Sequence, residues 1–347
     1  NAKLLAYAYY NHADGLNNLR MTALANGVDF HALGLSDKKP GYRFAAKANI
    51  DASARSIDDI TGSAKVFDIR WLESRGEGLK VNNISLTADS LGPKPSLTLN
   101  SDVARGVIKG PYTLSTLVPQ LRSLAALFIP ALVGDEETHT PSAESGANDF
   151  DFELTLLPSQ SVTAFFGAPV HVITDIKIRG EVDSPRKRAN INIDAPYLVQ
   201  GTRLLEQTSL YAALDSADTE ARLYAATTFP TKKGDMTLTS RLGIADNRID
   251  TRIDWGIARA IPLSGTIDFS TLLRAIPARG TATFPLDARI DFNPGTINFG
   301  YETWQIAPST IDIAPQRIDV SDFSLDAGTQ RIDINGTVGD SSDDRID

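Results

Sequence analysis

The sequence predicts a mainly β protein with many short antiparallel strands and almost no helix. The dipeptide Ile-Asp occurs eleven times. Neighbouring residues of a strand point to opposite faces, so each Ile-Asp pair places an apolar side chain on one face and a carboxylate on the other. Turn signals such as Pro294-Gly295 and Asp246-Asn247 separate these stretches at intervals of roughly eight to twelve residues. This spacing over the whole chain indicates about two dozen strands.

Composition limits the possible functions. The chain has 347 residues, of which 42% are hydrophobic and 22% are charged, and this is typical of a folded protein. There are 43 acidic residues against 34 basic ones, giving a net charge of -9. Because an acidic chain repels phosphate backbones, we expect no nucleic-acid partner. The absence of cysteine excludes disulfides and thiolate metal sites.

Both ends of the sequence favour an internal piece of a longer chain. Asn1 stands where an initiator methionine would be, and Leu4, Leu5 and Tyr7 are apolar with no basic leader before them. The last residues, RIDINGTVGDSSDDRID, end at Asp347 while the strand pattern is starting again. We therefore expect three segments: a β segment at 1–110, a helix and acidic loop at 111–150, and a second β segment at 151–347.

The apolar run from Leu114 to Val133 has the length of a membrane span, but it contains Pro119, Pro130 and Arg122. We predict instead a short amphipathic helix between the two prolines. Residues at helical spacing form its apolar side: Leu117, Leu121, Leu124 and Phe128. This helix either packs over an apolar sheet face or gates a groove. Residues 134–149 after it are polar and acidic, as in a mobile surface loop.

The alternation is clearest in the second β segment. In RIDTRIDWG, the side chains of Ile249, Ile253 and Trp255 share one face of a strand. Applying the same rule to later strands gives a set of candidate residues that line one apolar surface: Ile249, Ile253, Trp255, Ile290, Phe292, Ile297, Phe299, Ile311, Ile313, Ile318, Val320, Ile332 and Ile334. Periodicity alone leaves open whether this surface is a filled core or an open trough.

Several architectures accommodate so many strands. They are a large barrel, several sandwiches, a parallel β-helix, or an elongated sheet folded over along its length. Aromatic residues make up only 7% and there are 18 prolines, which disfavours an outer-membrane barrel. No strict short repeat is present, which disfavours a parallel β-helix.

The sequence predicts neither an enzyme nor a metal or cofactor site. The histidines have no partner at ligand spacing: His12, His31, His139 and His171. Gly76–Gly78 lacks the context of a dinucleotide-binding loop, and there is no Walker sequence and no GxSxG motif. The acidic residues near the C-terminal end indicate a solvated turn rather than a calcium loop: Asp340, Asp343, Asp344 and Asp347.

Three stretches resemble a known family. Ile176–Leu204 reads as a strand, a Gly-x-Val, a turn with proline and another strand, which resembles the repeated unit of the TamB family in the AsmA-like superfamily. Ile334–Asp347 is similar to the same unit in Bacteroidetes-type members, with Ser342 at a position where proline is frequent. Ser161–Val182 resembles the short helical break before a strand. The resemblance covers about two thirds of the chain, mainly from Phe150 onward.

The resemblance implies a taco-shaped antiparallel β-sheet, bent lengthwise into a U-shaped groove lined by apolar residues, with one or two short helices. Members of the family are anchored in the inner membrane, cross the periplasm and meet a barrel-type partner in the outer membrane. Their proposed work is the carriage of phospholipids between the membranes, or assistance to the assembly of outer-membrane proteins. We therefore expect a periplasmic middle segment, whose membrane anchor and C-terminal partner-binding end lie outside these 347 residues.

The residues themselves favour the same function. Strands with one apolar face need something to cover that face, and few helices are predicted to do so. A continuous apolar strip binds acyl chains without polar specificity. Two rivals are a chaperone that accepts client strands at its sheet edges, and a carbohydrate-active enzyme. The enzyme ranks last, because Trp71, Trp255 and Trp304 are too scattered in the sequence to indicate a sugar-binding cleft.

Overall fold

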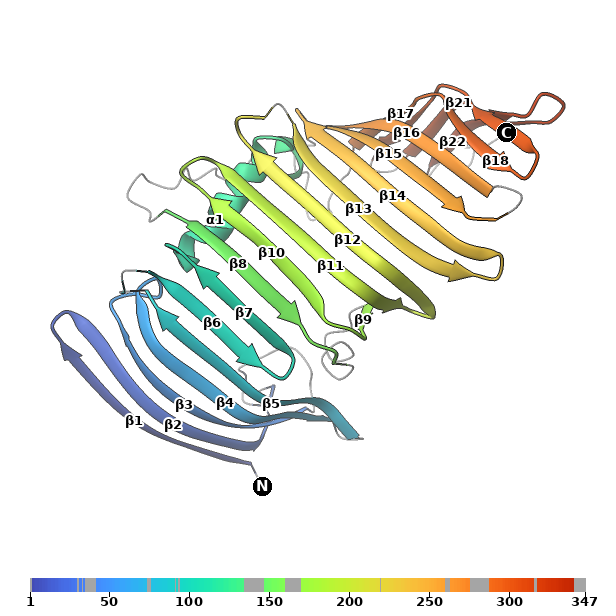
Figure 1. Ribbon diagram of the computed structural model, residues 1–347. Coiled ribbons are helices and arrows are strands. Elements are labelled where there is room, and N and C mark those ends of the chain that lie inside the picture. Colours follow the sequence, from blue (N-terminus) through green and yellow to red (C-terminus); the bar gives the residue numbers. More distant parts are fainter. Residues whose placement is uncertain are drawn as a thin grey trace. The chain divides into compact units, whose positions relative to one another are not determined.

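A computed structural model gives the structure of the chain (Figure 1). It describes residues 2–29, 31–32, 34, 42–73, 76–90, 92, 94–133, 147–159, 170–218, 220–259, 263–274, 287–314 and 317–339. In these ranges, 22 strands belong to one antiparallel sheet, and there are two short helices. The mainly β fold class predicted from the sequence is confirmed.

The chain divides into two compact units. Unit 1 comprises Asn1–Val118, Glu144–Pro185 and Asn192–Leu204, and unit 2 comprises Pro119–Ala143, Arg186–Ile191 and Leu205–Asp347. The helix α1 (Leu114–Ala126) and the strands β11 (Arg188–Gln200) and β12 (Arg203–Asp215) each contribute residues to both units. The acidic loop predicted after the helix lies mostly outside the described residues.

Unit 1 is an antiparallel meander. Its strands are β1 (Lys3–Ala13), β2 (Leu16–Val28), β3 (Arg43–Ala54), β4 (Ile60–Glu73), β5 (Gly76–Asp89), β6 (Ser96–Ser101), β7 (Ala104–Lys109), β8 (Asp149–Leu156), β9 (Val170–Val172) and β10 (Ile176–Asp183). Each strand from β1 to β8 pairs with the next, and β8 then pairs with β10. Short turns join most of these strands, as the turn signals predict.

Strands β1 to β5 curve along their length in Figure 1, and the pairing register is interrupted between β2 and β3, between β3 and β4, and between β4 and β5. The β2–β3 pairing shifts between Ala25 and Val28, and Asp68 of β4 has a positive φ of 52°. Bulges of this kind increase the local bend of a strand. A small apolar cluster lies on these strands: Ala46, Ile69, Leu79 and Val81 are buried, with Phe44 and Trp71 packed against them.

The carboxylate of Asp102 binds two consecutive backbone N–H groups of β5. Asn82 and Asn83 both point their backbone N–H groups at the carboxylate of Asp102, at 2.9 Å and 3.2 Å. Asp102 lies in the turn between β6 and β7, so this contact fixes β5 to the next hairpin. Burial raises the pKa of Asp102, but the backbone donors Asn82 and Asn83 outweigh burial and hold the pKa below its usual value.

Unit 2 continues as a meander with two broken strands. Its strands after β12 are β13 (Ala221–Thr231), β14 (Gly234–Ala245), β15 (Arg248–Ile257), β16 (Leu263–Arg274), β17 (Asp287–Phe292), β18 (Gly295–Phe299), β19 (Glu302–Ile306), β20 (Ser309–Ala314), β21 (Arg317–Asp326) and β22 (Arg331–Gly339). Both β17 and β18 pair with β16, so they are two halves of one strand that breaks at Asn293–Pro294. The next strand breaks opposite, at Ala307–Pro308, because proline cannot donate to the ladder.

The helix differs from the prediction. It was expected between Pro119 and Pro130, but α1 begins at Leu114 and contains Pro119. A separate short helix, α2 (Pro130–Val133), begins at the second proline. The early start has a tertiary cause: Asp58 accepts hydrogen bonds from the backbone N–H of Ser115, at 2.8 Å, and from its hydroxyl. A carboxylate at the first turn stabilises the positive end of a helix.

Asn148 holds the start of the same helix. Its side chain is completely buried and accepts a hydrogen bond from the backbone N–H of Thr113 at 2.8 Å. Its amide nitrogen donates to Thr116 at 3.2 Å, and Ser184 bonds to both its backbone N–H and its carbonyl. A buried polar side chain with every group satisfied specifies a single arrangement.

The far end of the helix region is fixed to the turn between β14 and β15. Asp246 and Asn247 have φ values of 49° and 64°, as in the two-residue hairpin turns that match strand twist. The backbone N–H of Asn247 donates to the carbonyl of Phe128 at 3.0 Å, and its side-chain oxygen accepts from Ala131 at 2.7 Å. This turn therefore joins the two helices to the sheet of unit 2.

Substituting Asn247 should separate the two contributions of this residue. Asn247→Gly keeps the left-handed backbone accessible but removes the acceptor for Ala131, and we expect it to cost about 1 kcal/mol of unfolding free energy. Asn247→Ala should cost roughly 1 kcal/mol more, because alanine is strained at positive φ. Urea unfolding followed by circular dichroism measures both. Equal losses in the two variants would contradict the conformational part of the argument.

Candidate functional site: the apolar faces of the sheet

The pairing register of unit 2 collects alternate residues of every strand onto one face. Directly opposite residues of antiparallel strands point the same way. Ile253 of β15 therefore shares a face with Ile267 of β16, and Ile290 of β17 shares it with Ile311 of β20. Following these pairs from β14 to β22 places all thirteen candidate lining residues on this face, here called the apolar face of unit 2.

This apolar face is covered only in part: Thr251, Ile257, Leu273, Ala288 and Ile306 on it are buried, whereas the candidate lining residues are not. None of the thirteen residues is buried: ten are half-buried, and Phe299, Ile318 and Ile332 are exposed, with 51%, 42% and 47% of their surface accessible. Inward-facing residues of a sandwich or a closed core are usually almost completely buried. The arrangement therefore favours an apolar surface available to a ligand, although the role of these residues in lipid binding stays a prediction.

Unit 1 has an apolar face of the same kind. One row of directly opposite residues runs from β2 to β10: Met21, Ile50, Ala64, Leu86, Leu99, Gly106, Leu154 and Ile178. These residues are half-buried, except for Leu86, of whose surface 39% is accessible. No lining residue was predicted here from the sequence, although the same alternation is present in these strands.

Aromatic side chains partly fill the apolar face of unit 2. The indole of Trp255 lies across Gly265, where an added Cβ would come within 2.7 Å of the ring nitrogen. Further along, Phe292 packs against Phe269 at a centroid distance of 5.5 Å and against Phe323 at 5.8 Å. These contacts stabilise the face without a second layer, because edge-on and tilted ring pairs are favourable.

A ladder of ionic contacts stabilises the opposite, polar face. Arg-Ile-Asp occurs in four strands of unit 2, and in each triplet the arginine and the aspartate point to the polar face while the isoleucine points to the apolar one. The arginine contacts its own aspartate at 2.8 Å to 3.3 Å in all five triplets that the structure describes: Arg248–Asp250, Arg252–Asp254, Arg289–Asp291, Arg317–Asp319 and Arg331–Asp333.

Most of these aspartates also accept a hydrogen bond from a Ser or Thr hydroxyl on the neighbouring strand of the sheet. Thr266 donates to Asp254 at 2.7 Å, and Thr310 donates to Asp291 at 2.9 Å. Ser270 and Thr337 make the corresponding bonds to Asp250 and Asp319. The triplet therefore joins neighbouring strands on the polar face.

The ladder lowers the pKa of its carboxylates. The Thr266 hydroxyl lowers the pKa of Asp254 most, and Arg252 lowers it further against the opposing effect of burial. Burial raises the pKa of Asp291, but the bonds from Thr310 and Arg289 outweigh it and keep the pKa below its usual value. These carboxylates are therefore charged at neutral pH in the folded chain.

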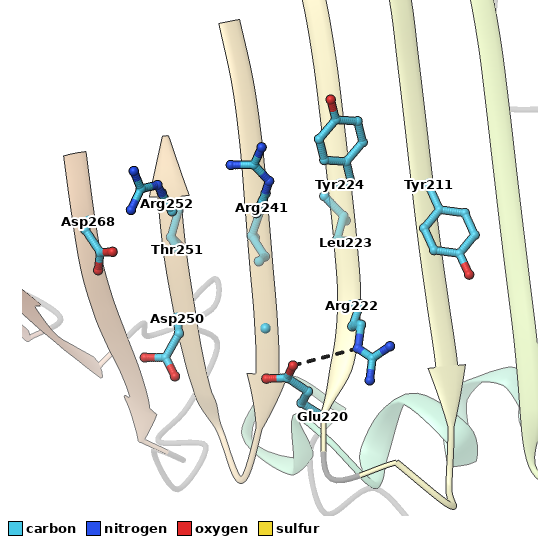
Figure 2. A pocket seen from close by; sticks show the side chains of 12 residues that line it. Tyr211, Glu220, Arg222, Leu223, Tyr224, Arg241, Asp250, Thr251, Arg252 and Asp268 are labelled. Atoms are coloured by element: carbon cyan, nitrogen blue, oxygen red, sulfur yellow. Dashed lines mark ion pairs between the residues drawn. The ribbon is translucent and has the colours of Figure 1, made fainter. Parts of the chain in front are cut away.

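A shallow hollow of about 410 Å³ lies on this polar face (Figure 2). Tyr211, Tyr224, Arg241, Arg252 and Asp268 lie in one row across five strands, each opposite the next. In the neighbouring row, the carboxylate of Glu220 fills the space that Gly243 leaves and lies 3.8 Å from Arg222. The charged groups around the hollow compensate one another, so we assign no ligand to it.

The predicted helix residues take two different environments. Leu117 and Leu121 are half-buried, whereas Leu124 and Phe128 are buried, with 7% and 5% of their surface accessible. Phe128 follows the end of α1 and packs where Asn247 meets the helices. Gating by this helix stays a prediction.

The described residues contain no group of three or more His, Asp or Glu side chains placed to hold a metal ion. None of the helices in the described ranges has the length and apolar character needed to cross a membrane. No family model, curated protein or solved structure matches the chain. The resemblance to the TamB family therefore stays a prediction.

Acid should weaken the ladder. A carboxylate whose folded pKa is lowered contributes stability that is present above its unfolded pKa, about 3.9, and is lost as the pH falls through the folded value. Thr266→Val removes the bond that lowers the pKa of Asp254 most. We expect it to cost about 1 kcal/mol or less at neutral pH, since the pair is partly exposed, and the difference from wild type should shrink below about pH 4.

The matched control is Thr237→Val. Thr237 donates to the backbone carbonyl of Gly256 rather than to a carboxylate, so its effect should not depend on pH in this range. Unfolding free energies measured by urea titration at a series of pH values give both profiles. A Thr266→Val loss that stays constant down to low pH would show that the hydroxyl does not act through Asp254.

Proposed function

We propose that the chain binds the acyl chains of phospholipids along its apolar sheet faces and carries them between the inner and outer membranes, in support of outer-membrane biogenesis. The observation that carries this proposal is the incomplete burial of thirteen apolar residues on one face of unit 2. An uncovered apolar surface of this kind is a binding surface in a soluble protein or an aggregation hazard.

Acyl chains match this surface in chemistry. The hydrophobic effect is non-directional and scales with the apolar area removed from water, roughly 25 cal/mol per Å². A row of Ile, Phe and Trp side chains therefore binds any acyl chain at many equivalent positions. Such binding suits carriage along a surface better than selection at one point. No catalytic chemistry is needed, and we propose that the chain is not an enzyme.

The polar face has a chemistry suited to contact with water, while the apolar face is left for the acyl chains. Its arginines and aspartates are paired with each other at close range, for example Arg241 with Asp254 at 2.9 Å. Ionic pairs of this kind keep the outer surface hydrated while the apolar face takes the ligand. The alternative function, assembly of outer-membrane proteins by strand addition, would use the backbone at the sheet edges instead.

Ile253→Asp tests the proposal in the middle of the apolar face of unit 2. Ile253 lies opposite Ser240 and Ile267, so a carboxylate there interrupts the apolar row on both sides. We expect the wild-type chain, purified from a Gram-negative host in mild detergent, to carry several phospholipids, and the variant to carry few. Native mass spectrometry with lipid extraction counts the bound lipid.

Thr237→Asp is the matched control, because Thr237 is exposed on the polar face of β14 and gains the same charge. It should retain wild-type lipid content. Circular dichroism confirms that each variant is folded. A folded wild-type chain without lipid, or equal lipid content in both aspartate variants, would reject the apolar face as the binding surface and favour the strand-addition function.

A further inference from the structure

A glycine on the apolar face of unit 2 lies beneath an aromatic ring. Gly265 of β16 pairs directly with Trp255 of β15. A Cβ added to Gly265 would lie 2.7 Å, 2.8 Å and 3.0 Å from the indole atoms Nε1, Cε2 and Cζ2 of Trp255. Atoms in van der Waals contact are about 3.5 to 4.0 Å apart, so the indole occupies the space that a larger residue at position 265 would need.

The indole of Trp255 therefore lies along the sheet. Side chains of a strand usually stand roughly perpendicular to the sheet. The ring of Trp255 instead leans across to the neighbouring strand, since three of its atoms come this close to the position above Gly265. Gly265 is buried, whereas Trp255 is half-buried, so part of the tryptophan remains accessible on the apolar face.

Ser309 of β20 has a similar position further along the same face. It lies opposite Phe292 of β17, and only 7% of its surface is accessible. Strand β20 lies between β17 and β21, whose backbones are therefore about 9.6 Å apart. The rings of Phe292 and Phe323 nevertheless approach to 5.8 Å, so they lean toward each other over β20.

The Ser309 hydroxyl is buried and has no hydrogen-bond partner among the residues that the structure describes. Most buried polar groups are paired, so an unpaired one needs an explanation. A small side chain covered by rings provides it, because the rings exclude water and offer no acceptor. Small residues therefore stand at two places where aromatic rings lie low on the apolar face.

We propose that Gly265 sets the depth of the lipid-binding surface, because it lets the indole of Trp255 lie along the sheet and acyl chains cross β15 and β16 over the ring. This inference rests on the proposed function and names a residue that determines how lipid fits the surface. Ile253 and Ile267 form the neighbouring directly opposed pair, so the indole continues the apolar surface beside them. A larger residue at position 265 would push the indole away from the sheet, into the path of the acyl chain.

Gly265→Val tests this role, because valine suits a strand but needs the space that the indole occupies. We expect the folded variant, purified in the same way as Ile253→Asp, to carry roughly half of the wild-type phospholipid or less. The displaced ring interrupts the apolar contact on which acyl binding depends. Native mass spectrometry with lipid extraction gives the lipid count, and circular dichroism confirms the fold.

Gly256→Val is the matched control. Gly256 is the next residue of β15 after Trp255 and points to the polar face, opposite Ser264. A Cβ added there would lie 3.4 Å from its nearest neighbour, the Cβ of Ser264, which is an ordinary contact. This variant should therefore keep the wild-type lipid content.

A double variant shows whether valine acts through the ring. Gly265→Val/Trp255→Ala has no indole to displace, so it should carry as much lipid as Trp255→Ala alone. Lipid content in the double variant as low as in Gly265→Val would show that valine acts in another way and would overturn the inference.

The position of the indole can also be measured without lipid. In a Trp71→Phe/Trp304→Phe background, Trp255 is the remaining tryptophan of the three in the chain. Quenching of its fluorescence by acrylamide should increase in Gly265→Val and stay unchanged in Gly256→Val. Unchanged quenching, or wild-type lipid content in Gly265→Val, would overturn the inference while the proposed function stands. A folded wild-type chain without bound lipid would reject both.

Discussion

The structure depends on one constraint, the agreement of side-chain alternation with pairing register across successive strands. A shift of one residue between two strands would carry every isoleucine of one strand to the polar face and every aspartate to the apolar face. In unit 1 the pairing of β3 with β4 shifts between Ala45 and Lys47, beside Asp68 with its positive φ of 52°. Phe44 and Val66, on either side of this shift, still pack against the same apolar cluster.

Stability without a covering layer requires another source of cross-strand interaction. The polar face supplies it through the Arg-Ile-Asp triplets and their hydroxyl donors on the next strand. Single exposed ion pairs contribute little, typically below about 1 kcal/mol, so repetition matters more than any one pair. The aromatic contacts of Phe292 and the buried cluster around Ile69 and Val81 add apolar packing. Together these interactions leave the rest of the apolar surface available.

The sequence was sufficient for the features that depend on neighbouring residues. Alternation alone predicted the mainly β class and assigned residues such as Ile253 and Phe292 to one face. It could not predict that α1 begins before Pro119, because that start depends on Asp58, which is 57 residues from Ser115. The role of the arginine in each triplet was also not predicted, although it directly precedes the Ile-Asp pair in the sequence. The hydroxyl that donates to the aspartate lies on another strand, as Thr266 does for Asp254, so only the register reveals the ladder.

All three tryptophans lie on the apolar faces, and they allow the central claim to be measured without any substitution. Trp71 packs on the buried cluster of unit 1, and Trp255 and Trp304 lie on the apolar face of unit 2. Tryptophan fluorescence in the presence of a phospholipid with brominated acyl chains, compared with the same lipid without bromine, reports contact between the indoles and the chains. An accessible apolar face that binds lipid predicts strong quenching by the brominated lipid alone. Equal fluorescence with both lipids would show that acyl chains do not reach these faces, and would contradict the account.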